Sequence, residues 1–130
     1  MFSQTVEYAL RAVVFLAQHE QTAQKTKDIS VGTKVPGPYL IKVLQGLQRA
    51  GLVTCQRGIG GGIRLCYAAS EITVLDVVNA VEPLPRIQTC PLELKSHGKR
   101  LCSLHRKMDD VYAQTEKVFG STTLQDLLDE

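Results

Sequence analysis

Apolar residues recur at intervals of three and four along much of this 130-residue chain, which predicts a protein built mainly from amphipathic helices. The spacing over residues 6–17 predicts the first helix. A polar turn over residues 18–25 follows, and Thr26 is placed to cap a short second helix over residues 27–33. His19 directly follows the first apolar stripe and is expected at the surface.

The most regular helical pattern lies just before Gly51, which is expected to end that helix at its C′ position. Its apolar stripe, at positions i, i+3, i+4 and i+7, is formed by Leu40, Val43, Leu44 and Leu47. The opposite face carries Tyr39, Lys42, Gln45 and Arg49. Pro38 suits the first helical turn, where its missing N–H costs nothing.

Two short apolar strands are predicted between residues 52 and 67, joined by a glycine turn that is flanked by Arg57 and Arg64. Cys55 and Cys66 fall on these strands, where a small buried side chain is the ordinary expectation. A helix with a cationic outer face, followed by a basic Gly-rich hairpin, is typical of a winged helix-turn-helix that binds duplex DNA.

A further helix is predicted to open at Thr73, which forms a capping pair with Asp76. Leu75, Val78 and Val81 are expected to share one face of this helix. The sequence Pro-Leu-Pro at 83–85 then interrupts the helical pattern, and residues 86–100 are polar and irregular.

A long helix is predicted over residues 101–119, ended by Gly120 and followed by a short capped turn after residues 121–123. Its apolar stripe consists of Leu101, Leu104, Met108, Val111, Tyr112, Thr115 and Val118. The stripe has little domain left to pack against, so we expect it to form a two-fold dimer with a second copy. Packing on the chain's own first helix is the alternative.

The predicted fold class is therefore mainly α with a small β-hairpin. Three segments are expected: a winged helix-turn-helix over residues 1–82, a linker and Cys/His loop over 83–100, and a dimerisation helix with a C-terminal cap over 101–130.

Charge is concentrated in one part of the chain. The formal net charge is only +2, but residues 25–64 contain seven cations and one acid, which gives +6 there and −4 elsewhere. A local excess of cations with almost no acids favours binding to nucleic-acid phosphates over an ordinary solvated surface.

Other classes of protein find little support in the sequence. No apolar run approaches the ~20 residues that span a membrane, and the N-terminus lacks a signal-peptide pattern, so a cytoplasmic protein is expected. Four cysteines in a reducing cytosol indicate metal binding or redox chemistry more than structural disulfides. No catalytic motif is present, and no enzyme activity is expected.

Five segments together resemble the Rrf2 family of bacterial regulators: TVEYALRAVVFLA, YLIKVLQGLQRAGLV, RGIGGGIRL, EITVLDVVNAVE and TTLQDLL. This family includes the iron–sulfur cluster regulator, the nitric-oxide-sensing repressor and the cysteine-metabolism regulator. The resemblance implies a cytoplasmic homodimer that binds a palindromic operator.

The resemblance also assigns residues to the two DNA grooves. Pro38, Tyr39 and Lys42 would face the major groove. The helical pattern places Lys27 and Gln45 on polar faces nearby, and they are predicted to contact DNA as well. The minor groove would receive the wing residues Arg57, Gly58, Ile59, Gly60 and Gly61. Glycines suit a groove about 6 Å wide because they keep the hairpin thin.

Cluster-binding members of the family have three cysteines spaced six apart, followed in some by a His three residues later. In this chain Cys90 and Cys102 occupy the outer positions, and His105 follows, but Ser96 replaces the central cysteine. Glu7 matches an acidic ligand that the family takes from the partner subunit. Four interpretations of this region remain open: a two-iron two-sulfur cluster, a zinc ion, a reversible Cys90–Cys102 disulfide, or no site.

The predicted function is a sequence-specific, homodimeric transcriptional regulator, with repression favoured. It would sense redox state, nitric oxide or iron–sulfur status through Cys90 and Cys102. The alternative is a small metal-binding or electron-carrying protein whose basic face is incidental.

Overall fold

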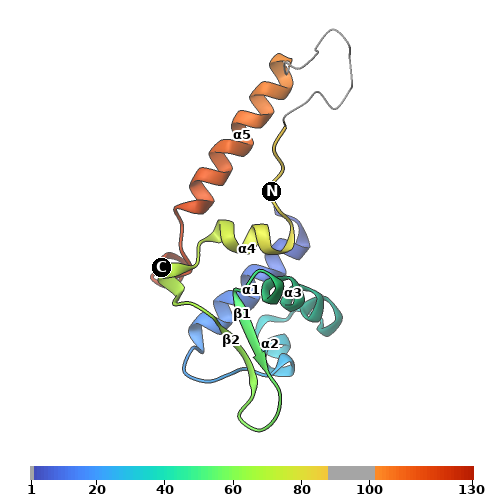
Figure 1. Cartoon of the computed structure of the whole chain (residues 1–130), viewed down its shortest axis with the longest axis vertical. Helices are drawn as coiled ribbons and strands as arrows, with labels where there is room; N and C mark the ends of the chain where they lie inside the picture. The colour runs from blue at the N-terminus through green and yellow to red at the C-terminus, as the bar shows by residue number, and fades with distance from the viewer. Residues whose placement is uncertain (1, 88–101) are drawn as a thin grey trace.

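The computed structural model describes residues 2–87 and 102–130, and every structural statement below concerns these residues (Figure 1). In chain order the elements are α1 (Gln4–Gln18), α2 (Thr26–Thr33), α3 (Gly37–Arg49), β1 (Val53–Gln56), β2 (Gly62–Leu65), the 3₁₀ turn η1 (Ala69–Glu71), α4 (Val74–Val81), α5 (Ser103–Gly120) and α6 (Leu124–Leu128). The predicted fold class is confirmed: helices dominate, and β1 pairs with β2 as an antiparallel hairpin.

Helix α1 lies at the centre of the core and contacts α2, α3, α4 and α6. Its N-terminus is capped by Ser3, whose side chain accepts a hydrogen bond from the Val6 N–H. The predicted apolar stripe is buried, and Ala9, Ala12 and Val13 have no exposed surface. Small side chains at these positions let the neighbouring helices approach closely.

Helix α2 begins one residue earlier than expected, and the predicted cap is wrong. Thr26 is the first helical residue, and Lys25 occupies the N-cap position without a side-chain hydrogen bond to the helix. A lysine side chain has no acceptor atom, so it cannot perform the capping role. Gly32 allows α2 to pack closely on α1, because a Cβ there would lie 2.2 Å from the Phe15 ring.

Helix α4 opens with the predicted capping box: the Thr73 side chain accepts from the Asp76 N–H, and the Asp76 carboxylate accepts from the Thr73 N–H. Its fully buried residues are Val74, Val77 and Val78. Leu75 and Val81, on the predicted apolar face with Val78, are partly buried, and Val81 packs against the core.

The C-terminal segment returns to the core beside α4. The Val74 N–H donates to the Thr122 carbonyl at 2.8 Å, and the Leu124 N–H donates to the Ile72 carbonyl at 2.9 Å. Helix α6 carries a second capping box, Thr123 with Asp126, and Leu124 is fully buried against the main core. This short backbone pairing anchors the last residues of the chain to the helical head.

Helix α5 extends away from the head, at the end of the molecule opposite to the hairpin (Figure 1). Its last turn is joined to the head by Phe119, whose ring centroid lies 5.1 Å from that of Phe2. His105 is the buried residue of this helix, and most of its other side chains are partly or fully exposed. No helix in the described part of the chain is both long and apolar enough to cross a membrane.

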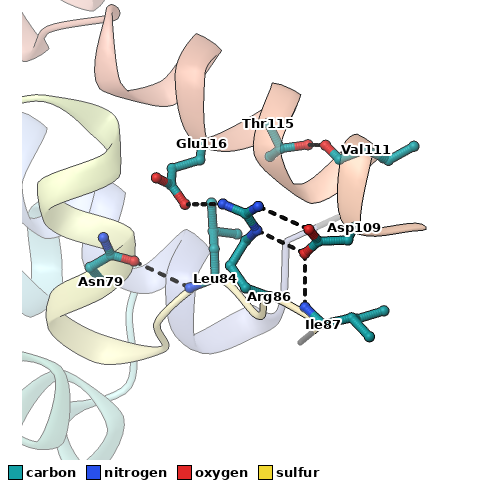
Figure 2. Close-up of polar contacts among 8 residues, drawn as sticks. All are labelled: Asn79, Leu84, Arg86, Ile87, Asp109, Val111, Thr115 and Glu116. Carbon is teal, nitrogen blue, oxygen red and sulfur yellow. Dashed lines mark hydrogen bonds and ion pairs between the residues drawn. The ribbon is translucent and has the colours of Figure 1, made fainter. Parts of the chain in front are cut away.

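Residues 83–87, which we call the strap, lead from α4 alongside α5, as Figure 2 shows. The Leu84 N–H donates to the Asn79 side chain at 3.2 Å. Arg86 donates two hydrogen bonds to the Asp109 carboxylate, at 2.8 and 2.9 Å, and the Ile87 N–H donates to the same group at 2.8 Å. The strap is therefore hydrogen-bonded to both α4 and α5.

These donors change the acidity of Asp109. The Arg86 hydrogen bonds, with a smaller contribution from the Ile87 N–H, lower the pKa of the Asp109 carboxyl to about 2. An unfolded chain leaves an aspartate near a pKa of about 3.9. Since the folded pKa is the lower one, this group stabilises the fold above about pH 4, and its contribution is lost as the pH falls towards 2.

Asp109→Asn is therefore expected to lower stability at neutral pH by an amount that shrinks as the pH falls from about 4 to 2. Urea unfolding midpoints of the parent and the variant over this pH range measure the difference. Asp110→Asn, at the adjacent exposed carboxylate, is the matched control. A stability difference that stays constant with pH would show that the Asp109 contact does not form in solution.

Candidate nucleic-acid interface

The outer face of α3 is exposed as predicted. Pro36 is its N-cap, Pro38 lies in the first turn, and Leu40, Val43, Leu44 and Leu47 are buried. The exposed side chains are Pro38, Tyr39, Ile41, Lys42, Gln45, Gln48 and Arg49. Gly46 faces the core, where a Cβ would lie 3.2 Å from the Ala80 carbonyl oxygen, so α4 supports α3 from behind.

The hairpin projects from the head as a narrow wing (Figure 1). Thr54 pairs with Arg64, and Gln56 pairs with Gly62, which leaves residues 57–61 to form the tip. At the tip, the Gly61 N–H donates to the Gly58 carbonyl at 3.0 Å. Gly58 and Gly60 have φ values of 98° and 76°, a conformation that favours glycine over any residue with a Cβ.

The base of the wing has an anchor that the sequence did not predict. Gln24, in the turn between α1 and α2, exchanges two backbone hydrogen bonds with Ile63, at 3.0 and 2.8 Å. Gly62 permits this contact, because a Cβ there would lie 2.8 Å from the Gln24 carbonyl oxygen. Backbone pairing of this kind leaves no side-chain signal in the sequence.

All seven cations of residues 25–64 are exposed on the turns and elements from α2 to β2: Lys25, Lys27, Lys34, Lys42, Arg49, Arg57 and Arg64. Within the described part of the chain, none of them forms an ion pair with an acidic side chain. They are therefore available to bind an external anion.

Two residues of α1, Tyr8 and Arg11, lie near the predicted interface residue Tyr39. The rings of Tyr8 and Tyr39 lie 5.9 Å apart, and the Arg11 guanidinium lies 5.7 Å from the Tyr8 ring centroid. An exposed cation of α1 thus lies beside the Tyr8 ring, which in turn lies beside Tyr39 in the first turn of α3. Its sequence signal was a single arginine on an amphipathic helix, which is too common to be informative alone.

The expectation of buried wing cysteines is wrong, because both Cys55 and Cys66 are exposed. Cys55 lies opposite the buried Ile63, but it borders an open notch of about 140 Å³ between α3 and the hairpin. Cys66 follows the end of β2, where the paired strands no longer shield it. A two-stranded hairpin is too narrow to bury both residues.

Of the predicted metal ligands, Cys102 and His105 are brought together. Cys102 is the N-cap of α5, and its Sγ lies 3.1 Å from His105 Nδ1 while also accepting the His105 backbone N–H at 3.5 Å. Glu7 is exposed on α1. Cys90 lies outside the described residues. In residues 2–87 and 102–130, no three His, Cys, Asp or Glu side chains are grouped as a metal site.

Most of the predicted dimerisation stripe lies on the surface of this single chain. Leu104, Met108, Val111 and Val118 are exposed, and Tyr112 and Thr115 are half-buried. Leu101 lies outside the described residues. A hollow of about 510 Å³ next to the stripe is lined mainly by apolar side chains from α1, α4, the strap and α5.

A three-helix unit with its third helix exposed, followed by a glycine-tipped hairpin, defines a winged helix-turn-helix protein. Comparison with known proteins agrees with this class. Residues 2–130 match the model of the Rrf2 family, described as iron-dependent transcriptional regulators. A provisionally assigned HTH-type transcriptional regulator of Aquifex aeolicus (strain VF5) is 30% identical over 131 residues, covering 98% of this chain and 91% of that protein.

Two solved structures are similar over almost the whole chain. IscR of T. potens has 26% identity and a TM-score of 0.81, with 99% of this chain and 86% of that chain covered. CymR, the global cysteine regulator of B. subtilis, has 25% identity and a TM-score of 0.78, with 98% and 95% covered. The chain belongs to the Rrf2 family of transcriptional regulators, and the predicted resemblance is confirmed. The family consists of regulators and not enzymes, as the sequence indicated.

Proposed function

We propose that this Rrf2 regulator is a homodimeric repressor that binds a palindromic DNA operator through α3 and the wing. The observation that supports this most directly is the exposed cationic surface formed by α2, α3 and the hairpin on one well-packed head. Phosphate binding requires such unpaired surface cations. Residues 1–82 would form the DNA-binding unit, residues 83–100 the linker and sensor loop, and residues 101–130 the dimerisation helix and cap.

The two grooves would be bound by different parts of this surface. Pro38, Tyr39, Lys42 and Gln45 lie on the exposed face of α3, which has the width to enter a major groove. The wing is thin enough for the adjacent minor groove, where Arg57 would interact with the negative potential of an A·T-rich sequence. Lys27 would bind the phosphate backbone nearby.

Arg57→Ala is expected to weaken operator binding by about 1–3 kcal/mol, because it removes the cation from the minor groove. Lys42→Ala should also weaken binding, and it should lower the slope of log K against log salt by about one if Lys42 contacts phosphate. Fluorescence anisotropy with a duplex selected from a random pool, measured at several salt concentrations, gives both values.

Lys117→Ala is the matched control, since it removes an exposed cation from α5, away from the wing and α3. Its affinity and salt slope should equal those of the parent. If Arg57→Ala and Lys42→Ala also behave like the parent, the proposed interface is wrong.

The homodimer is proposed from the exposed apolar stripe of α5. Leu104, Val111 and Val118 are each more than half exposed, at 62%, 55% and 56%, and they lie on one side of the helix. Adjacent exposed apolar side chains at helical spacing are costly in water and are typical of a helix–helix interface. A second copy would cover them, and a two-fold dimer would present two wings to a palindrome.

Val111→Glu is expected to destabilise the dimer by roughly 3 kcal/mol, or about 100-fold in dissociation constant, because it buries a charge at the two-fold interface. Operator affinity should fall with it. Sedimentation velocity at several protein concentrations measures the dissociation. Lys117→Glu, which introduces the same charge on the other side of α5, should remain dimeric. A parent protein that is monomeric at micromolar concentration would contradict the proposal.

The sensor proposal is supported by the contact between Cys102 and His105 at the start of α5. A thiolate and an imidazole are both ligands of zinc and of iron–sulfur clusters, so this pair fits either group, with Cys90 and the partner's copy of Glu7 as the further ligands. A cluster would supply one-electron redox chemistry when bound. Without a metal, the same two cysteines could form a reversible disulfide.

Cys90→Ser and Cys102→Ser are each expected to abolish the redox or metal signal while leaving a folded dimer. The signal is the difference in operator affinity between oxidised, reduced and metal-depleted protein. An effector changes DNA binding only if it interacts differently with the DNA-binding and the non-binding state. Glu7→Ala should weaken a cluster but leave a disulfide intact. If the double cysteine variant responds to oxidant, nitric oxide and iron removal as the parent does, the sensor lies elsewhere.

A further inference from the structure

The tip of the wing presents one apolar side chain that the fold does not use. Ile59 is fully exposed, at the apex of the turn closed by the hydrogen bond between Gly61 N–H and the Gly58 carbonyl. Gly60, with a φ of 76°, takes the third position of this turn, as in a type II turn. Isoleucine is normally selected for strands and cores, and here it contributes to neither.

The hairpin beneath the tip is held tightly. The Gln24–Ile63 hydrogen bonds fix its base to the turn between α1 and α2. At Gly61 a Cβ would lie 2.4 Å from the Gln56 carbonyl oxygen, so the tip passes close to the end of β1 at a position where a side chain would not fit. A hairpin anchored in this way can press its tip against a ligand with little loss of conformational entropy.

The surroundings of Ile59 indicate what the tip would contact. Arg57 lies two residues away, Arg64 lies on the neighbouring strand, and the remaining tip residues are glycines without side chains. Arg57 suits the negative potential of a narrow groove, Arg64 suits a flanking phosphate, and the branched apolar side chain suits the base edges on the groove floor. Apolar wedges in a minor groove partly unstack a base step and bend the duplex.

We infer that Ile59 is a minor-groove wedge that opens a flexible pyrimidine–purine base step in the operator. This inference rests on the proposed DNA-binding function and adds a specificity rule to it: a TA or CA/TG step lies under each wing. Such steps are the most easily unstacked, so a wedge selects them without any hydrogen bond to a base.

The test compares the parent protein with Ile59→Ser and Ile59→Leu. The serine variant removes the apolar volume, whereas the leucine variant keeps it. Since Ile59 packs against nothing in the head, neither variant should alter the fold, and circular dichroism checks this. Each protein first selects duplexes from a random 30-base-pair pool. The parent's preferred duplex is then prepared with 2-aminopurine replacing adenine at the step under the wing.

With the parent and Ile59→Leu, we expect enrichment of a pyrimidine–purine step and a rise in 2-aminopurine fluorescence on binding. With Ile59→Ser, both should be lost, while the slope of log K against log salt stays unchanged because no charge is removed. A selected operator with no step preference and no fluorescence rise overturns the wedge but leaves the DNA-binding function intact. Equal results for Ile59→Ser and the parent also overturn it. If the parent enriches no sequence at all, the proposed function itself fails.

Discussion

The burial of α1 is the constraint on which the rest of the structure depends. Ala9, Ala12 and Val13 are fully buried, and four other helices pack around this segment. Helix α3 cannot expose its polar face in a fixed direction unless its apolar stripe has this rigid surface behind it. The same is true of the wing, because its base is paired with the turn that directly follows α1. The orientation of both candidate DNA-binding elements is thus determined by one buried helix.

The backbone pairing between residues 72–74 and 122–124 has a comparable role for α5. It fixes the C-terminal end of α5 beside α4, while the strap, through Arg86 and Asp109, is bound further along the same helix. Because α5 is attached to the head at two separate points, its direction relative to the head is fixed. A single attachment would let the helix pivot. The long helix can therefore project from the head at a defined angle, although few of its own side chains are buried.

Structural features were predicted correctly from the sequence where the interactions that cause them join residues close together in the chain. The period of α1 and α3, the Thr73–Asp76 capping box of α4, the cap before α6, and Gly51, which follows α3 with a φ of 78°, all depend on neighbours within a few residues. Contacts between distant segments were not predictable: Gln24 with Ile63 involves only backbone atoms, and Arg86 with Asp109 joins residues 23 positions apart. The errors at Thr26, Cys55 and Cys66 have the same origin, since tertiary packing decides which residue ends a turn and which strand face is covered.

The two ends of the molecule expose apolar side chains in different ways, and the difference is informative. On α5 the exposed residues form a continuous stripe, which favours another apolar helix surface. At the wing, a single isoleucine is surrounded by glycines and cations, which favours a narrow, negatively charged partner. In a dimer formed through α5, the spacing of the two wings would be set by the angle between the paired helices. A ligand held at the α5 N-terminus, where Cys102 and His105 meet, would act on that spacing through the helix. Such a ligand would need no contact with the proposed DNA-binding surface, because α5 would connect the two.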